Sequence, residues 1–494
     1  MGQRNRKRNY LTGIILFIFA FAIVFFGVQF ITKTGLFKIP GVVYYGEELS
    51  EAELTLLQSI FTEEVELDKD VAISANDYLE LPELNENDFL FSVLVPVTDY
   101  YSAETYVAAS SPSELLLKAA AEDSSINLIN VDELNFKQKL LSINDDYYLN
   151  SFNSGAIFRI ITFESEKFDE EIRPLIEQAF TKTYLTKDTT LSFAQTGVTA
   201  LSRGMNAKLY EVGDANYFAA EIKDYLSSFD LTHTSNESSF SDYAGPNNIC
   251  SDRRFIDTLT AIGLDIVELT GNHNQDCGDE AAIESVDIYN EKGIKVVGGG
   301  KTAKEAKTPL NINQKGNNIA FLAYNLSTGG ATLDDTPGAN QYDEENAVEE
   351  ITDAKSRGDF VIVDIQYYEC STYVAFEEDT TCDYANSSAG DQIGFFRHLI
   401  DIGADIVVGT SAHQPQTFEL YGNGAIYYGL GNLFFDQYWW PGTTRSLVLE
   451  HYFYNGKLLQ TKIVPTVYDG TMQTRVLDKE SSTWFLQRLI SERP

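Results

Sequence analysis

The chain has 494 residues, enough for two or more domains, and 44% of them are hydrophobic, as in an ordinary globular protein. Its formal net charge is −37, so it lacks the excess of lysine and arginine with which proteins bind nucleic acid or anionic surfaces. The composition therefore argues against nucleic acid as a partner. The acidity either keeps the protein soluble or holds divalent cations loosely.

The N-terminus departs from this acidic trend. Residues 1–10 carry four basic side chains and no acidic one, and residues 11–31 are uncharged and largely apolar. A helix of that length spans the ~30 Å hydrocarbon core of a bilayer, and a basic flank stays on the cytoplasmic side. We predict a cytoplasmic tail (1–10), a transmembrane signal anchor (11–32) and a linker (33–45), which makes a single-pass protein of the cell membrane with its C-terminal bulk outside the cytoplasm. A cleaved signal peptide is the alternative, but it has a shorter apolar region and a small-residue cleavage site, and neither is apparent.

Residues 46–185 alternate helical stretches with short apolar strands, which predicts an N-terminal extracytoplasmic domain of the α/β or α+β class. This segment contains no histidine and no cysteine, and it carries no catalytic motif.

Residues 188–470 show a clearer alternation of strands and helices and form the second predicted domain, before a C-terminal tail at 471–494. Apolar strands are expected over 189–197, 231–235, 264–270, 294–299, 317–325, 360–366, 404–410, 425–431, 446–454 and 457–468. Helices are expected over 218–229, 253–263, 279–293, 345–358 and 391–403. Alternation of this kind predicts a layered α/β fold with helices outside the sheets, and the last strands read as consecutive antiparallel ones.

All four cysteines lie in the part predicted to be exported, where disulfides persist. Cys370 and Cys382 flank an acidic loop and are expected to bridge it, which leaves Cys250 to pair with Cys277. A four-cysteine metal site is the rival interpretation, but no Cys-x-x-Cys pair supports it.

Polar side chains gather where the predicted strands end. Ligands of open α/β sheets bind beyond the carboxyl ends of the strands, so these residues are expected to converge. Imidazole, carboxylate and amide groups delivered from several strand ends are what a transition-metal hydrolase needs. The residues concerned are Asn236, Glu237, Asn272, His273, Asp276, Gln366, Glu369, Ser411, His413, Asn432 and Asp436.

Five segments occur in a familiar order: "TGVTALSR" (196–203), "SNESSF" (235–240), "LDIVELTGNHNQDCG" (264–278), "GDFVIVDIQYYE" (358–369) and the long stretch from 403 to 436. With them, residues 188–470 resemble the CapA-type family of poly-γ-glutamate capsule synthesis, within the calcineurin-like metallophosphoesterase superfold. The resemblance implies a layered α-β-β-α sandwich (calcineurin-like metallophosphatase fold), preceded by the transmembrane helix and the smaller domain, with a metal site at the strand ends.

The chain departs from the family pattern at three ligand positions. Val198 stands where the family has an aspartate, and Gln366 and Ser411 stand where it has histidines. The ligands that the resemblance still supplies are Glu237, His273 and His413, enough for at most one divalent transition metal (Mn, Zn or Fe). By the same resemblance, Asn272 orients a ligand oxygen, and Asp276 or Glu369 handles a proton or supports a metal ligand.

Two hypotheses of function follow. The first is a metal-dependent hydrolase, phosphoesterase-like, of envelope or capsule biosynthesis, with a capsule or cell-wall polymer and membrane proteins of a synthesis complex as partners. The second is a catalytically inactive binding or scaffolding protein that keeps the fold. Asn272 and His273 have a plainer alternative role as caps of the next helix. His398 and His451 read as structural, and His233 is a strand residue that is placed to replace a missing imidazole.

Overall fold

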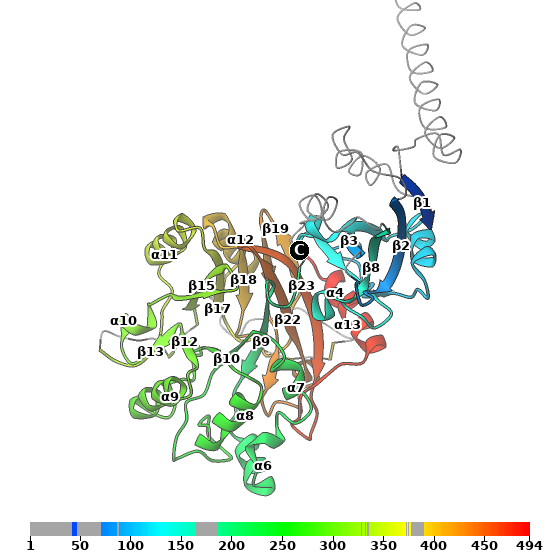
Figure 1. The fold of residues 1–494 in the computed structure, drawn as a ribbon. Helices are drawn as coiled ribbons and strands as arrows, with labels where there is room; N and C mark the ends of the chain where they lie inside the picture. The colour runs from blue at the N-terminus through cyan, green and yellow to red at the C-terminus, as the bar shows by residue number, and fades with distance from the viewer. Residues whose placement is uncertain are drawn as a thin grey trace, which may run out of the picture.

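The computed structural model describes residues 42–46, 71–85, 88–121, 123–164, 185–327, 329–330, 332, 335–371, 373, 375–376 and 390–494. Within these residues no helix is long and apolar enough to cross a membrane. The segment predicted as a signal anchor, 11–32, lies outside them. Figure 1 shows the arrangement of the described elements.

The N-terminal part is built on one mainly antiparallel sheet. Its strand order is β1 (Val42–Gly46), β2 (Val71–Glu80), β8 (Ser154–Glu164), β3 (Asp88–Asp99) and β5 (Asn127–Asn130), and β6 (Gln138–Leu140) also pairs with β3. The short strands β4 (Tyr106–Val107) and β7 (Ser142–Ile143) form a separate pair. In the described residues of this part, the helical elements are α3 (Pro112–Ala119), the 3-10 turn η1 (Val131–Glu133) and α4 (Tyr148–Ser151). Helix α3 begins where Ser111 caps the backbone N–H of Glu114 and Pro112 occupies the first turn.

The C-terminal part contains two large sheets. The first has the order β12 (Lys295–Val297), β11 (Ile266–Glu268), β10 (Leu231–Asn236), β9 (Leu191–Thr199), β22 (Arg445–Tyr454), β23 (Lys457–Val467) and β24 (Arg475–Val476), with β21 (Asn432–Phe434) beside β9. The second has the order β14 (Leu310–Gln314), β15 (Asn317–Asn325), β17 (Phe360–Gln366), β18 (Ile406–Gly409), β20 (Gly424–Tyr427) and β19 (Phe418–Tyr421). A two-stranded sheet joins β13 (Gly299–Gly300) to β16 (Gly338–Ala339).

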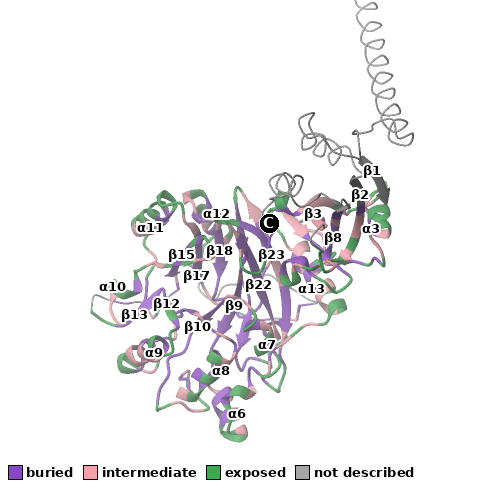
Figure 2. Cartoon of the chain, viewed as in Figure 1, coloured by how far each residue is buried: buried purple, intermediate pink, exposed green. Residues whose placement is uncertain are grey.

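Helices cover the outer faces of both sheets. The first sheet carries α6 (Gly204–Val212), η3 (Ala215–Tyr217), α7 (Lys223–Leu226), η4 (Arg253–Phe255), α8 (Ile256–Ala261) and α9 (Asp279–Glu291), and the second carries α11 (Glu344–Ser356) and α12 (Gln392–Ile402). The short elements α10 (Ala303–Ala306) and η5 (Pro441–Thr444) lie in connections. One apolar cluster fills each helix–sheet interface, and a third fills the space between the sheets. The sheets are accordingly buried and the helices expose one side (Figure 2), so the order of layers is α-β-β-α as predicted.

Several elements differ from the sequence-based expectation. The helix predicted over 218–229 is reduced to α7 and irregular turns, and α6 was not predicted. The segment expected to be a plain tail, 471–494, contains β24 and helix α13 (Lys479–Ser491). Phe485 and Leu489, four residues apart on α13, are buried in the cluster between the sheets, and this tertiary packing orders the segment.

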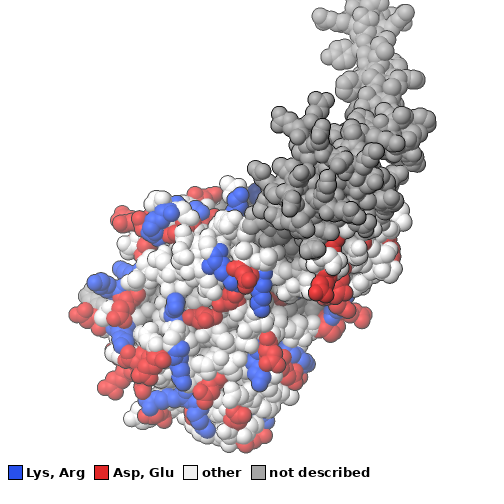
Figure 3. Space-filling view, viewed as in Figure 1, with Lys and Arg blue, Asp and Glu red and all other residues white. Residues whose placement is uncertain are grey.

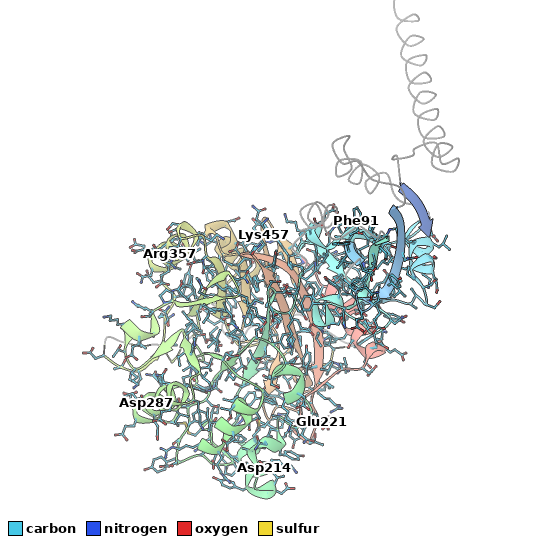
Figure 4. The ribbon with its side chains drawn as sticks, in the orientation of Figure 1. Phe91, Asp214, Glu221, Asp287, Arg357 and Lys457 are labelled. Atoms are coloured by element: carbon cyan, nitrogen blue, oxygen red, sulfur yellow. A yellow bond between two sulfur atoms is a disulfide. The ribbon has the colours of Figure 1, made fainter. Side chains whose placement is uncertain are left out.

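The N-terminal sheet packs directly on the C-terminal part. Tyr452 of β22 and Leu459 of β23 belong to the same apolar cluster as Val95 and Phe158 of the N-terminal sheet. The side chain of Gln460 accepts a hydrogen bond from the backbone N–H of Leu140 at 2.9 Å. Figure 4 shows side chains filling the space between these elements, while charged residues such as Asp214 and Arg357 lie at the periphery.

Candidate functional site at the strand ends

The carboxyl ends of four strands bring the predicted site residues to one edge of the sandwich. Glu237 follows β10 and the turn 270–278 follows β11, and these two strands are parallel neighbours in the first sheet. Gln366 ends β17 and His413 follows β18, which are parallel neighbours in the second sheet. The site is therefore built where the two sheets meet, as expected for this class of fold.

Glu237 forms the buried floor of the site. It has no exposed surface, and its backbone N–H donates to the carbonyl oxygen of Thr199. Gly271 lies so close that a Cβ there would come within 2.7 Å of the Glu237 Cα, so only glycine lets the turn approach the carboxylate. Burial is the main cause that raises the pKa of Glu237 above its usual range.

The side-chain amide of Gln366 joins the two halves of the site. Its Nε2 donates to Oε1 of Glu237 and to Oδ1 of Asn272, each at 3.0 Å. The Asn272 amide in turn donates to Oε1 of Glu369 at 3.0 Å. These three bonds form a continuous chain from Glu237 through Gln366 and Asn272 to Glu369.

His273 lies between two carboxylates. Its Nδ1 is 2.8 Å from Oδ2 of Asp276, and its Nε2 is 3.5 Å from Oε1 of Glu369. Burial opposes the charged imidazolium, but the hydrogen bond to Glu369 and the charges of Glu237 and Asp276 together raise the pKa of His273 to about 9. The same hydrogen bond is the main cause that lowers the pKa of Glu369 to about 2.

His413 closes the other side of the site. Its Nδ1 is 2.9 Å from Oδ1 of Asn432, whose own amide donates to Gln437. The amide oxygen of Asn432 only accepts hydrogen bonds, so Nδ1 of His413 carries a proton and donates to it, and Nε2 of His413 lies 3.8 Å from Oε2 of Glu237. The ring also contacts the aromatic rings of Tyr373 and Phe435.

Disulfides flank both loops that carry the exposed carboxylates. Cys250 is bonded to Cys277, the residue after Asp276, which confirms that predicted pair. Cys370, the residue after Glu369, is also disulfide-bonded, and its expected partner Cys382 lies outside the described residues.

The three residues that differ from the family's usual ligands are Val198, Gln366 and Ser411, and all three lie at the site. Val198 is fully buried on β9, paired with Ser235 on one side and Asn432 on the other. The hydroxyl of Ser411 is buried and has no hydrogen-bond partner.

The alternative role of Asn272 and His273 as caps of the next helix is wrong, because the cap of α9 is Gly278, which makes no side-chain capping bond.

The residues of the site do not fit a resident catalytic metal. Among the described residues no group of three or more His, Cys, Asp or Glu side chains is arranged to hold an ion. Both nitrogens of His273 face carboxylates, and the Gln366 amide occupies one oxygen of Glu237. Only Glu237 and His413 are left as a pair, whereas a catalytic metal needs about three protein ligands.

The remaining histidines lie elsewhere. His233 is buried between the sheets with its Nε2 3.1 Å from Oδ2 of Asp364, and His451 contacts Thr461 and Gln195 in the same interior. His398 is on the outer helix α12 and pairs with Glu344.

Sequence reasoning missed two groups. One is the pair of buried acids Glu268 and Asp364 beneath the site; acidic residues inside the apolar strands "LDIVELT" and "FVIVDIQ" were the signal. The other is Tyr373 beside His413, which no pattern in the sequence marks.

The fold and the site together define an α/β sandwich protein with a polar site at the strand ends of two facing sheets. Residues 192–437 match the family described as "Bacterial capsule synthesis protein PGA_cap". Through this domain the chain belongs to that CapA-type capsule-synthesis family.

Individual relatives give the same assignment. The chain is 27% identical over 225 residues to a "Capsule biosynthesis protein CapA" of Bacillus anthracis, a match that covers 44% of this chain and 52% of the relative. It is 26% identical over 209 residues to the "PGA biosynthesis protein CapA" of Bacillus subtilis, covering 42% and 52%. A "Probable polyglutamine synthesis accessory protein" of Mycobacterium tuberculosis is 23% identical over 194 residues, covering 37% and 48%. The chain thus spans about half the length of the curated relatives it matches.

Proposed function

We propose that this chain is a membrane-anchored, extracytoplasmic binding protein of capsule or envelope polymer synthesis, of the poly-γ-glutamate type. The family match and the names of the relatives support the process. The apolar segment 11–31 with its basic flank supports the anchor. The Cys250–Cys277 disulfide supports a location outside the cytoplasm. A capsule or cell-wall polymer and membrane proteins of the synthesis complex are the proposed partners.

The observation that carries a binding role is the position of the Gln366 amide. One NH₂ group donates to a carboxylate oxygen of Glu237 and to the amide oxygen of Asn272, the two acceptors that a metal ion would otherwise take at this edge. With Val198 buried on the neighbouring strand, the site has no ligand set for a two-metal clamp. The layered architecture and the resemblance support the calcineurin-like metallophosphatase superfold, here with its metal chemistry lost.

Figure 3 shows lysine and arginine interspersed with aspartate and glutamate over the face in view. A mixed surface of this kind suits a protein that works beside other proteins or a polymer without adhering broadly to either.

A second candidate function, a hydrolase with a single metal ion, is favoured by one observation. Oε2 of Glu237 and Nε2 of His413 are 3.8 Å apart, and that carboxylate oxygen has no hydrogen-bond partner.

Metal content decides between the two functions. The full-length chain, purified in detergent under oxidising conditions, is dialysed against Mn, Zn and Fe in turn and then analysed by elemental analysis. We expect far less than one equivalent of each ion. One equivalent, lost in Glu237→Gln and His413→Ala but kept in the control His398→Ala on the outer helix, would establish the hydrolase instead.

Localisation is tested separately in intact cells of an expression host. We expect the chain in the membrane fraction, its bulk digested by external protease, and release from the membrane when residues 1–32 are removed. Resistance to the protease would contradict the proposed orientation.

A further inference from the structure

The floor of the site contains buried polar atoms that make no hydrogen bond. Oε2 of Glu237 is fully buried and makes no hydrogen bond, and Nε2 of His413 lies 3.8 Å from it, beyond hydrogen-bond range. The hydroxyl of Ser411, two residues before His413, is also buried and makes no hydrogen bond. Buried polar groups in native proteins are normally hydrogen-bonded, so the free carboxylate oxygen of Glu237 indicates a ligand group that donates to it.

The charged residues around the floor of the site determine whether the bound ligand group is a cation or an anion. Glu369 and Asp276 lie at the partly exposed rim, and among the ion pairs of the described residues the site carboxylates have only histidine partners. The neighbouring guanidinium of Arg203 is engaged by Asp436 at 2.6 Å and lies over the Phe435 ring. Three carboxylates face two imidazoles, so the site repels an anion and attracts a cation.

An aromatic wall adjoins the same floor. The ring of Tyr373 contacts His413 on one side and stacks on Trp440 on the other, with centroids 5.2 Å apart. Trp440 is 43% exposed and Trp439 is 52% exposed, and the ring of Tyr438 contacts Trp439. Aromatic faces are negative and attract ammonium groups, and they also cover the apolar chain attached to such a group.

We propose that the site binds a ligand through a primary ammonium group, which donates to Oε2 of Glu237, while the adjoining apolar part of the ligand lies on Tyr373 and Trp440. A primary ammonium has three donors and no acceptor, which suits the unpartnered carboxylate oxygen of Glu237, and its charge matches the carboxylate rim. The ligand class is therefore an amine-bearing molecule or an amine-terminated polymer chain, and a polyanionic segment is repelled. This inference rests on the proposed binding function.

The test uses three probes that share a benzyl group and differ in the polar head: benzylammonium, benzyl alcohol and phenylacetate. Each is titrated calorimetrically into the full-length chain in a nonionic detergent. We expect benzylammonium to bind about tenfold or more tightly than benzyl alcohol, and phenylacetate to bind least. Glu237→Gln should abolish the preference for the ammonium, Trp440→Leu should weaken all three probes, and Glu344→Gln on α11 should change nothing.

One further variant and one stability measurement keep the outcome clear. Ser411→Ala removes a hydroxyl that makes no hydrogen bond, so it should fold normally and weaken only benzylammonium. Cooperative urea unfolding checks that Glu237→Gln is folded. Equal affinity for the three probes, no binding of benzylammonium, or an unchanged preference in folded Glu237→Gln would overturn the inference. Such a failure with no bound metal leaves the proposed binding function standing, whereas one equivalent of metal overturns that function itself.

Discussion

The Nε2 of Gln366 donates a 3.0 Å hydrogen bond to Oε1 of Glu237, a carboxylate with no exposed surface. This bond links the second sheet to the first at the centre of the candidate site. A neutral amide therefore connects the two sheets at this edge.

The first prediction concerns this bond. Gln366→Leu leaves the buried oxygens of Glu237 and Asn272 without their donor, so the free energy of unfolding should fall by about 2–3 kcal/mol. Urea denaturation measures the change. The control Gln487→Leu, on the exposed side of α13, should stay within about 0.5 kcal/mol of the parent. Equal stability of the two variants would show that the amide does not hold the site.

Gly271 gives a second prediction. In Gly271→Ala the new Cβ would lie 2.7 Å from Cα and 2.9 Å from Cγ of Glu237, and these backbone and side-chain atoms must move. We expect a loss of about 1–3 kcal/mol and a weaker affinity for benzylammonium. Gly245→Ala is the matched control, because its Cβ meets nothing nearer than 3.9 Å. If both alanine variants bind the amine like the parent, the turn is not required to position Glu237.

The Cys250–Cys277 disulfide gives a third prediction. It closes a loop with a sequence separation of 27, so replacing both cysteines by alanine should lower the free energy of unfolding by roughly 3–4 kcal/mol. Since Cys277 follows Asp276, the rim of the site should also loosen and the affinity for benzylammonium should fall. Chemical denaturation and calorimetry measure the two effects. Unchanged affinity for benzylammonium in a destabilised variant would show that the disulfide is not needed to position the site.

Buried Glu268 gives a prediction on pH. Burial is the main cause that raises the pKa of Glu268 from 4.5 to about 7, and the charge of nearby Asp364 adds to it. Between pH 4.5 and 7 the folded chain holds a proton that the unfolded chain has lost, so this contribution to stability is complete below 4.5 and is lost as the pH rises to 7.

Glu268→Gln removes this dependence. Between pH 5 and 8 the parent should lose roughly 3 kcal/mol more of its unfolding free energy than the variant. Urea denaturation at a series of pH values measures the difference. Parallel curves for the two proteins would show that Glu268 keeps an ordinary pKa in the folded state.

Much of the second domain was predictable because its strands have a recognisable pattern of apolar residues in the sequence. Strands β15 and β17 occupy the expected residues, since continuous apolar runs such as "FVIVDIQ" are typical of strands buried on both faces. Helix α13 was not predicted, because its ordering comes from Phe485 and Leu489 packing between the sheets and not from a local pattern. The N-terminal anchor stays a prediction.

The candidate site, like the fold, was predictable from the sequence only in part. By itself the sequence determined which polar residues follow the strand ends and that Val198, Gln366 and Ser411 cannot act as the family's usual ligands. Only the tertiary structure decided that the Gln366 amide bridges Glu237 and Asn272, and that Nε2 of His413 faces a carboxylate oxygen. The physical reason is that strand order and side-chain periodicity are local properties of the chain. Hydrogen-bond partners across two sheets depend on distances that the packing of the whole sandwich sets.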